Sequence, residues 1–432
     1  MSHSSIETVG GSGLSHGERV MTRLEQLARF STEPGALTRL YLSPAHKEAC
    51  RQVRAWMEAA GMTSRIDAVG NVVGRYEGRT PSAPALLLGS HIDTVRNGGK
   101  YDGSFGVVAA IEAVSCLKNA GERMAIAIEV LAFGDEEGVR FPVALTSSRA
   151  VAGTLDPATL DAKDSEEISI REALRRFGCS ADEIPSAARR TADVLGYIEL
   201  HIEQGPVLEA EGLPLGVVTA IAGASRATAE ITGMAGHAGT VPMALRRDAL
   251  AAAAEMLLAV EEIARSMQDV VATAGWIEAM PGAVNVIPGG ARFSLDVRSP
   301  RDAVRNEATA RIEEAFRTIA ARRNVGVRLV RSYEEAAATC APWLVEQLAT
   351  ALGRSGIRPR NLPSGAGHDG LAMAALCPIG MLFVRCKGGI SHHPAEAVTA
   401  ADAGIAITVL VDFLRHFVPS LGLTAALETP AP

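Results

Sequence analysis

The chain has 432 residues, with 42 Lys and Arg against 49 Asp and Glu, so its formal net charge is −7. At about 150 residues per domain, this length predicts two or three domains that can each bury a core. A mildly acidic chain has no electrostatic reason to bind nucleic acid or anionic lipid. A composition of 47% hydrophobic and 21% charged residues argues against extensive disorder.

The cysteines and the N-terminus indicate a cellular compartment. The six cysteines include no C-x-x-C pair, which excludes a thiolate zinc site and a disulfide framework. The polar stretch Met1–Gly17 has no apolar core of a signal peptide, and the uncharged run Gly370–Val384 is too short to span a bilayer. We therefore expect a cytoplasmic protein with free thiols.

Helices and strands alternate in the first half of the chain. Apolar spacing predicts a helix over Glu18–Phe30, and a second helix begins after the capping residue Ser43 and ends before Gly61. A helix over Gly106–Leu117 separates the first two of three apolar strands, Ala85–Ser90, Ala125–Phe133 and Val194–Ile202. A polar stretch before the third strand contains one short helix, opened by the capping box that begins at Ser169. This order predicts a parallel or mixed sheet that is covered on both faces.

The pattern changes near Ala220. Arg226–Thr232 alternates polar and apolar residues, as a strand with one solvated face does. A helix, two strands, a helix and a strand follow: Asp248–Arg265, Val270–Ile277, Ala291–Val297, Arg301–Arg323 and Val325–Arg331. This βαββαβ order is that of a ferredoxin-like domain. We expect an α/β catalytic domain with a mixed sheet, formed by residues 1–220 and 334–432, and an inserted α+β domain at 221–333.

Histidines and carboxylates follow successive strands of the predicted α/β domain. These residues are His91 and Asp93, Asp102 in the next turn, Glu136 and Glu137, His201 and Glu203, and then His392, His393 and Glu396 after a late strand at Ile379–Val384. Ligands of open α/β sheets collect beyond the carboxyl ends of the strands. We therefore expect these side chains to share one edge of the sheet.

Imidazoles and carboxylates without thiolates suit catalytic Zn²⁺ or Mn²⁺. Their number fits two metal ions that share a bridging carboxylate and activate a water. Glu136 and Glu137 are adjacent, so one can bind metal while the other acts as a general base. A lone His is more often a structural residue, and a Glu pair is more often solvated loop charge. Their repetition at successive strand ends favours the metal site.

Six segments together resemble the hydantoinase/carbamoylase amidases, and they occur in the order of that family. They are Gly89–Val95, Tyr101–Gly103, Gly134–Gly138, His201–Pro206, Gly365–Asp369 and Ile390–Glu396. The family includes N-carbamoyl-L-amino acid hydrolases, allantoate amidohydrolases and β-ureidopropionases, and is related to aminoacylase and carboxypeptidase metallopeptidases. The resemblance extends over roughly Arg23 to Phe417.

The resemblance implies a set of metal ligands: His91 and His201 for one ion, Glu137 and His392 for the other, and Asp102 between them. It implies Glu136 as the general base, and Asp93 as the residue that orients His91. Whether His392 or His393 is the ligand stays open.

The resemblance also implies residues that contact substrate. His237 would hold the substrate carbonyl or the tetrahedral intermediate, and Gln204 would contact the ureido group. Asn285 and Arg298 would bind the substrate carboxylate, for which an Arg offers two parallel donors. Gly365 and His368 are further substrate candidates. Without the resemblance, Arg298 is equally well explained by a surface salt bridge and His368 by a structural role.

The predicted activity is that of a two-metal amidohydrolase. It would cleave the terminal ureido (carbamoyl) group of a small acid, such as an N-carbamoyl-L-amino acid or allantoate, and release ammonia and CO₂. The resemblance implies two divalent ions, Zn²⁺ first and Mn²⁺ as the alternative, a homodimer formed through the inserted domain, and closure of that domain as a lid. An N-acyl amino acid hydrolase or dipeptidase, and a metal-binding protein without catalysis, are the competing interpretations.

Overall fold

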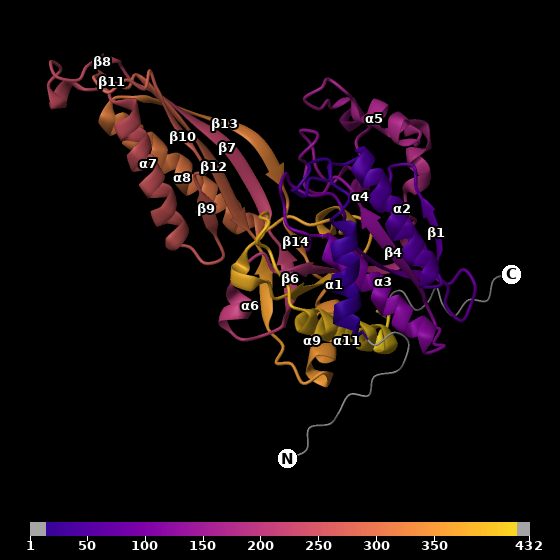
Figure 1. Ribbon diagram of the computed structural model, residues 1–432. Coiled ribbons are helices and arrows are strands. Elements are labelled where there is room, and N and C mark those ends of the chain that lie inside the picture. Colours follow the sequence, from indigo (N-terminus) through magenta and orange to yellow (C-terminus); the bar gives the residue numbers. More distant parts are fainter. Residues whose placement is uncertain (1–13, 421–432) are drawn as a thin grey trace. The chain divides into compact units, whose positions relative to one another are not determined.

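The structure is a computed structural model that describes residues 14–420, and it divides into two compact units (Figure 1). The first unit contains the described residues up to Thr219, together with Cys340–Leu362 and those from His368 onward. The second unit contains Ala220–Thr339 and the short segment Pro363–Gly367. Within the described residues, no helix is long and apolar enough to cross a membrane.

A mixed sheet forms the centre of the first unit. Its strand order is β1 (Thr63–Ile66), β2 (Val72–Tyr76), β4 (Ala127–Phe133), β3 (Ala85–His91), β5 (Val194–Ile202), β16 (Ile379–Val384) and β6 (Leu215–Ile221), with β15 (Asn361–Ser364) also beside β6. The inner strands β4, β3, β5 and β16 are parallel, whereas β1, β2 and β6 pair antiparallel. The predicted mixed α/β sheet is confirmed.

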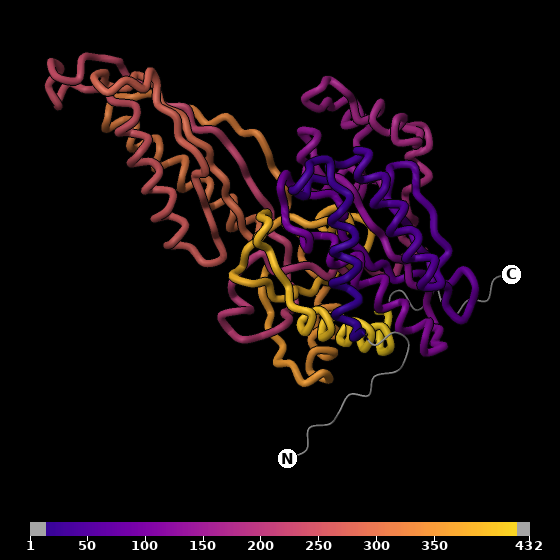
Figure 2. The backbone as a smooth tube through the Cα atoms, in the orientation of Figure 1, coloured from indigo at the N-terminus to yellow at the C-terminus, as the bar shows by residue number. Residues whose placement is uncertain are grey.

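Helices cover this sheet. Every residue of β3, β4, β5 and β16 is buried, as expected for apolar strands with both faces covered. The packed helices are α1 (His16–Leu27), α2 (Pro44–Ala59), α3 (Ser104–Asn119), α9 (Pro342–Arg354) and α11 (Ala400–His416). Helices α1 and α11 lie side by side although they come from opposite ends of the sequence (Figure 2).

Capping predictions are confirmed at two helices. The Ser43 hydroxyl accepts a hydrogen bond from the His46 backbone N–H at the start of α2. Ser169 does the same for Glu172 at the start of α5 (Ile170–Phe177). Four further elements of this region were not predicted: α4 (Thr146–Ala152) and the 3₁₀ turns Pro157–Asp161, Ala181–Ala187 and Thr191–Asp193. They are too short to show a helical period.

The second unit is a five-stranded sheet with two helices on one face. The strand order is β10 (Ile277–Met280), β12 (Gly290–Ser299), β7 (Gly223–Thr232) and β13 (Gly326–Glu335), with β9 (Val271–Thr273) also beside β12. Helices α7 (Ala249–Arg265) and α8 (Asp302–Arg323) bury a core that includes Ile231, Phe293 and Phe316. β14 (Ala338–Thr339) pairs with the last residues of β6, and β8 (Gly236–His237) and β11 (Val286–Ile287) form a separate small ladder.

The predicted single strand over Val270–Ile277 is wrong. The structure has two short strands there, β9 and β10, which pair with different parts of β12. Between them, the backbone N–H groups of Gly275 and Trp276 donate to the Ser294 hydroxyl, at 2.9 and 3.2 Å. The Ser294 backbone N–H still donates to the Trp276 carbonyl at 3.2 Å, but the Ser294 side chain accepts from both N–H groups, so the ladder is irregular and the strand is interrupted.

Arg39 joins the segments around the end of β3. It is only 1% exposed, and burial lowers its pKa to about 10. Its guanidinium donates to the backbone carbonyls of Ile92, Leu27 and Phe30 and to the Ser104 hydroxyl. These groups lie after β3, at and just beyond the end of α1, and at the start of α3.

We predict that Arg39→Met lowers the free energy of unfolding by about 2–4 kcal/mol, because four buried acceptors lose their donor. Urea denaturation followed by circular dichroism measures the change. The control is Arg51→Met, which removes an exposed ion pair with Glu48 on α2 and should change stability by less than about 0.5 kcal/mol. Equal losses in the two variants would contradict this account of Arg39.

Candidate metal centre and substrate-binding residues

The predicted ligands of the first unit come together at one edge of its sheet. His91 is the last residue of β3, and His201 lies at the end of β5. Glu136 and Glu137 follow β4, and His392 follows β16. Because these four strands are parallel, their carboxyl ends meet at the same edge. Asp102 lies just before α3 at this edge.

One ligand group contains two imidazoles and a carboxylate oxygen. Asp102 Oδ1 lies 3.5 Å from His91 Nε2 and 3.1 Å from His201 Nε2. The Nδ1 atoms face backbone carbonyls, that of Asp93 at 3.1 Å from His91 and that of Ile202 at 2.9 Å from His201. A carbonyl only accepts, so each Nδ1 carries its proton. In the neutral rings, both Nε2 lone pairs then face the Asp102 carboxylate.

The second ligand group lies on the other oxygen of Asp102. His392 Nε2 is 3.4 Å from Asp102 Oδ2 and 3.5 Å from Glu137 Oε2. Asp102 therefore presents one oxygen to each group. This is the geometry of a carboxylate that can bridge two ions.

Both groups fit divalent cations. In each, the three ligand atoms lie within 4.8 Å of one another. The atoms that meet are all electron-pair donors, so a cation between them, or additional protons, is needed to stabilise the arrangement. Among the described residues, Glu137 Oε1 is also buried without a hydrogen-bond donor. Imidazole and carboxylate ligands suit Zn²⁺ and Mn²⁺.

Glu136 lies beside these groups, with its Oε2 at 3.8 Å from His91 Nε2. Burial raises the pKa of Glu136 well above its ordinary value, against the effect of His91 and with a further contribution from Glu137. A carboxylate with a raised pKa is a stronger base. Glu136 is therefore suited to take a proton from a nucleophile in this centre.

Asp93 supports both the histidine and the two glutamates. Its carboxylate oxygens accept hydrogen bonds from the backbone N–H groups of Glu136 and Glu137, each at 3.3 Å. Asp93 Oδ1 also lies 3.5 Å from His91 Nδ1, which is closer to the Asp93 carbonyl. Its carboxylate thus mainly holds the loop after β4.

The backbone at the centre is strained. Asp135, Gln204 and His392 have left-handed φ angles of 65°, 55° and 56°, which non-glycine residues rarely adopt. At Gly103, with φ of +60°, a Cβ atom would lie 2.4 Å from the His91 ring, so only glycine allows the close approach. Such strain persists where the surrounding structure holds it in place, often at functional sites.

The structure distinguishes the remaining histidines. The His393 Nδ1 accepts a hydrogen bond from the Ala395 backbone N–H, while His392 approaches Asp102 and Glu137. The buried His368 ring packs edge-on against His201, with 4.5 Å between ring centroids. His392 thus lies in the second candidate ligand group, whereas His368 packs against His201.

Gln204 and Ser391 bind the Asp102 carboxylate directly. Gln204 Nε2 and Ser391 Oγ donate to Asp102 Oδ2 at 2.8 and 2.6 Å, and Gln204 Nε2 also lies 3.1 Å from Ser391 Oγ. The expected contact of Gln204 with a ureido group is therefore accompanied by a contact with the bridging carboxylate. Sequence reasoning assigned Ser391 no role, although it lies in the segment of His392.

Glu396 was expected at this edge of the sheet, but the sequence assigned it no role. It is 3% exposed, and its Oε1 accepts hydrogen bonds from the backbone N–H groups of Tyr101 and Asp102 at 2.8 and 3.0 Å. Glu396 lies four residues after His392. It therefore ties the loop that carries the bridging carboxylate to the loop that carries a ligand of the second group.

Glu199 joins two strand ends below the imidazoles. Its buried carboxylate accepts from the Ser90 hydroxyl and the Gly370 backbone N–H, both at 3.0 Å. Ser90 precedes His91 on β3, and Glu199 lies two residues before His201 on β5. Gly370 begins the short helix α10 (Gly370–Met373). This carboxylate was also not predicted.

The other predicted substrate residues lie in the second unit, in two pairs. Arg298 Nε and Nη2 donate to the Asp296 carboxylate at 3.0 and 2.9 Å, and Nη1 donates to the Gly365 carbonyl at 2.9 Å. His237 lies on β8, where it pairs with Val286, and the Ala238 N–H donates to the Asn285 carbonyl at 3.0 Å. Arg298 and Gly365 are thus neighbours, as are His237 and Asn285.

These two pairs lie at opposite ends of the second unit: Arg298 is near one end of the β7–β12 ladder, and His237 and Asn285 lie in or beside the separate β8–β11 ladder beyond its other end (Figure 1). β12 and β7 pair without a bulge from Gly290 and Thr232 to Ser299 and Gly223. Beyond Gly290 the pairing continues outward, through Gly233 and Gly289, to His237 and Val286. At about 3.3 Å per residue, Gly290 and Arg298 alone are about 26 Å apart. Asn285 and His237 of one chain therefore lie farther than that from Arg298.

The parallel α/β edge with its imidazole and carboxylate groups is the centre of a metal-dependent hydrolase. Comparison with known proteins agrees: the model of Peptidase family M20/M25/M40 matches residues 87–416, and the chain belongs to this family. Enzymes of this family typically depend on divalent metal ions.

Relatives that match most of the chain include named amidohydrolases and deiminases. The chain is 44% identical over 395 residues to an N-carbamoyl-L-amino acid amidohydrolase of Geobacillus stearothermophilus, covering 91% of this chain and 97% of the relative. It is 38% identical over 430 residues to allantoate deiminase of Arabidopsis thaliana, covering 92% and 82%. A hydantoinase/carbamoylase family amidase from Burkholderia multivorans has a similar crystal structure, with TM-score 0.86, 33% identity and coverage of 93% and 97%. The chain is an amidohydrolase of this hydrolase family.

We predict that Glu396→Ala weakens metal binding by about 10- to 100-fold, because both backbone N–H groups near Asp102 lose their acceptor. Glu396→Gln retains an amide oxygen and should lose less. Metal content after chelation and reloading with limiting Zn²⁺, measured by mass spectrometry, gives the effect independently of turnover.

The matched control is Asp67→Ala. Asp67 also accepts from two backbone N–H groups, those of Val69 and Asn71, in the turn between β1 and β2. This variant should lose stability but keep its metal content. A Glu396→Ala protein that binds metal as tightly as the control would refute the positioning role.

Proposed function

We propose that this chain hydrolyses the terminal ureido group of a small ureido acid in a centre that holds two divalent ions, Zn²⁺ first and Mn²⁺ as the alternative. The observation that carries the proposal is the Asp102 carboxylate, which presents one oxygen to His91 and His201 and the other to His392 and Glu137. The N-carbamoyl-amino acid and allantoate relatives support the ureido substrate.

The chemistry divides between the ions and the chain. When bound, the ions would polarise the ureido carbonyl and lower the pKa of a water. Glu136 would accept the proton of the attacking water and later donate it to the departing nitrogen. Addition of one water releases ammonia and leaves a carbamate, which loses CO₂ to give the amine.

Arg298 would bind the substrate carboxylate. The Asp296 carboxylate accepts from Nε and Nη2, and the Gly365 carbonyl accepts from Nη1, so the substrate carboxylate would accept from the remaining N–H groups of Nη1 and Nη2. The bidentate ion pair fixes the orientation of the guanidinium. Gln204 would contact the ureido group beside Asp102.

A single chain does not bring Asn285 and Arg298 to the same small carboxylate, because the β12 ribbon separates them by more than about 26 Å. We therefore propose a homodimer through the second unit, in which Asn285 and His237 of one copy complete the site of the other. The second unit, predicted from the sequence as an inserted ferredoxin-like domain, would then act both as lid and as dimerisation domain.

Ammonia release tests the activity. After loading with Zn²⁺ or Mn²⁺, we expect ammonia from N-carbamoyl-L-amino acids or allantoate, and Glu136→Gln should bind metal normally while its kcat falls by at least about 100-fold. Cleavage of N-acetyl amino acids or dipeptides without ammonia release would support the competing peptidase-type function instead. Full turnover by the metal-loaded Glu136→Gln variant would exclude Glu136 as the general base.

Mixed dimers test the shared site. Arg298→Ala and His237→Ala should each be impaired, but a mixture refolded together should recover about a quarter of the wild-type kcat/KM, because half of the dimers are mixed and each then has one intact site. Mixing His237→Ala with Asn285→Ala is the control, and should recover nothing, since both residues come from the same copy. Recovery in neither mixture would argue against sharing between copies.

A further inference from the structure

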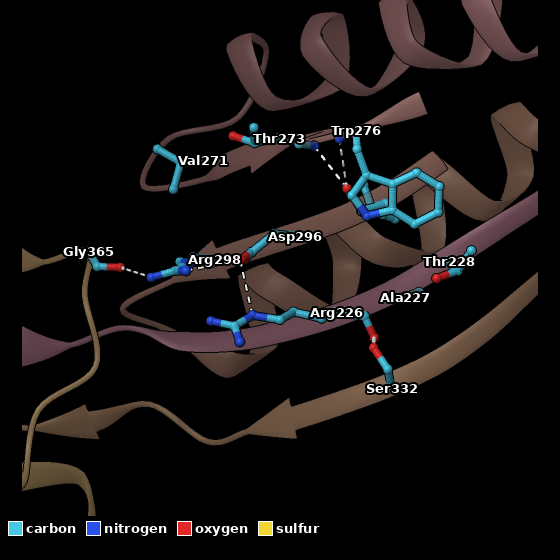
Figure 3. A pocket seen from close by; sticks show the side chains of 13 residues that line it. Arg226, Ala227, Thr228, Val271, Thr273, Trp276, Asp296, Arg298, Ser332 and Gly365 are labelled. Carbon is cyan, nitrogen blue, oxygen red and sulfur yellow. Dashed lines mark hydrogen bonds and ion pairs between the residues drawn. The ribbon is translucent and has the colours of Figure 1, made fainter. Parts of the chain in front are cut away.

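The second unit contains a cavity of about 660 Å³ on the face of its sheet that α7 and α8 do not cover (Figure 3). Its lining comes from β7, β9, β12 and the segment between β9 and β10, with Gly365 at one end. A cavity of this size is in the range of small-molecule sites. It is several times larger than a carboxylate group needs.

The register of the strands places its side chains in rows. Arg298 on β12 pairs with Val271 on β9, and Asp296 pairs with Thr273. One step farther along β12, Ser294 pairs with Thr228 and holds the backbone of Trp276. Paired residues of an antiparallel sheet point to the same face, so the cavity runs from Arg298 toward Trp276.

The end of the cavity at Arg298 carries excess positive charge. Arg298 and Arg226 both donate to the single carboxylate of Asp296. Although burial acts in the opposite sense, the two guanidinium groups lower the pKa of Asp296, so it stays ionised at neutral pH. Two cations against one anion leave a net charge of +1, which favours an acid at this end.

The rest of the cavity exposes apolar surface. Val271 is 60% exposed and Trp276 is 46% exposed, and both line the cavity. The neighbouring Thr228, Thr273 and Ser294 carry no charge. Trp276 and Val271 therefore form an apolar surface beside an anion-binding end. An apolar group of a ligand that covers this surface gains binding free energy in proportion to the apolar area removed from water.

On the proposed function, we infer that this cavity receives the α-substituent of the substrate, and that the substrate class is N-carbamoyl-L-α-amino acids with a large apolar or aromatic side chain. The carboxylate would bind Arg298, and the side chain would cover Val271 and reach toward Trp276. Allantoate carries a second ureido group in place of this side chain. Placed against Val271 and Trp276, that polar group would lose water without gaining hydrogen bonds.

The test compares kcat/KM for N-carbamoyl-L-phenylalanine, N-carbamoylglycine and allantoate. We expect the phenylalanine derivative to exceed the other two by at least about tenfold. Trp276→Ala and Val271→Ala should each lower this preference about three- to tenfold and leave N-carbamoylglycine within about twofold of wild type. Val330→Ala is the matched control, because Val330 on β13 is also a partly exposed valine that pairs with Thr228 but does not line the cavity.

A binding measurement separates this inference from the proposed function. Calorimetric titration of N-carbamoyl-L-phenylalanine and N-carbamoylglycine into Glu136→Gln protein, with and without Trp276→Ala, reports the cavity without turnover. Tighter binding of the phenylalanine derivative that Trp276→Ala removes would support the inference even if no ammonia is released. Equal preference in wild type and Trp276→Ala, or a preference for allantoate, would overturn it while leaving ureido hydrolysis intact.

Discussion

The Asp102 carboxylate is the interaction on which the site depends. Its two oxygens face two separate groups of ligands, and each approach places further lone pairs next to an already negative carboxylate. A buried anion of this kind is stable only when positive charge is supplied to both sides. The geometry thus fits cations on both oxygens of Asp102.

Holding one carboxylate in this position engages much of the surrounding structure. Ser391 and Gln204 donate to its Oδ2, while Glu396 binds the backbone N–H of the same residue. These contacts come from the segments after β5 and β16, so the strands of the sheet fix the centre through short loops. The left-handed φ angles of Gln204 and His392 show that these loops accept backbone strain to make the contacts.

The sequence predicted the structural features that depend on hydrophobic periodicity and on local motifs. The strand β5 was predicted with its bounds, because a run of nine residues that are mostly apolar gives a clear signal for a covered strand. The short edge strand β1 gives none, since four half-exposed residues show no period. Which histidine of the pair 392 and 393 faces Asp102, and which carboxylates brace the ligands, depends on loop conformation. Residue types do not encode that information directly, so the contacts of Ser391, Glu199 and Glu396 became visible only in three dimensions.

In the second unit, by contrast, a regular strand fixes the distance between two predicted substrate residues. A strand that pairs without a bulge has a nearly constant rise per residue. Arg298 and Asn285 are therefore separated by about the length of β12, and side-chain rotation cannot close that distance. The sequence resemblance implies that both residues contact a substrate, and the proposed homodimer would satisfy both expectations. The same regularity aligns Val271 and Asp296 beside Arg298 on one face. On the proposed function, the strand that separates Arg298 from Asn285 would thus bring together the side chains that distinguish one ureido acid from another.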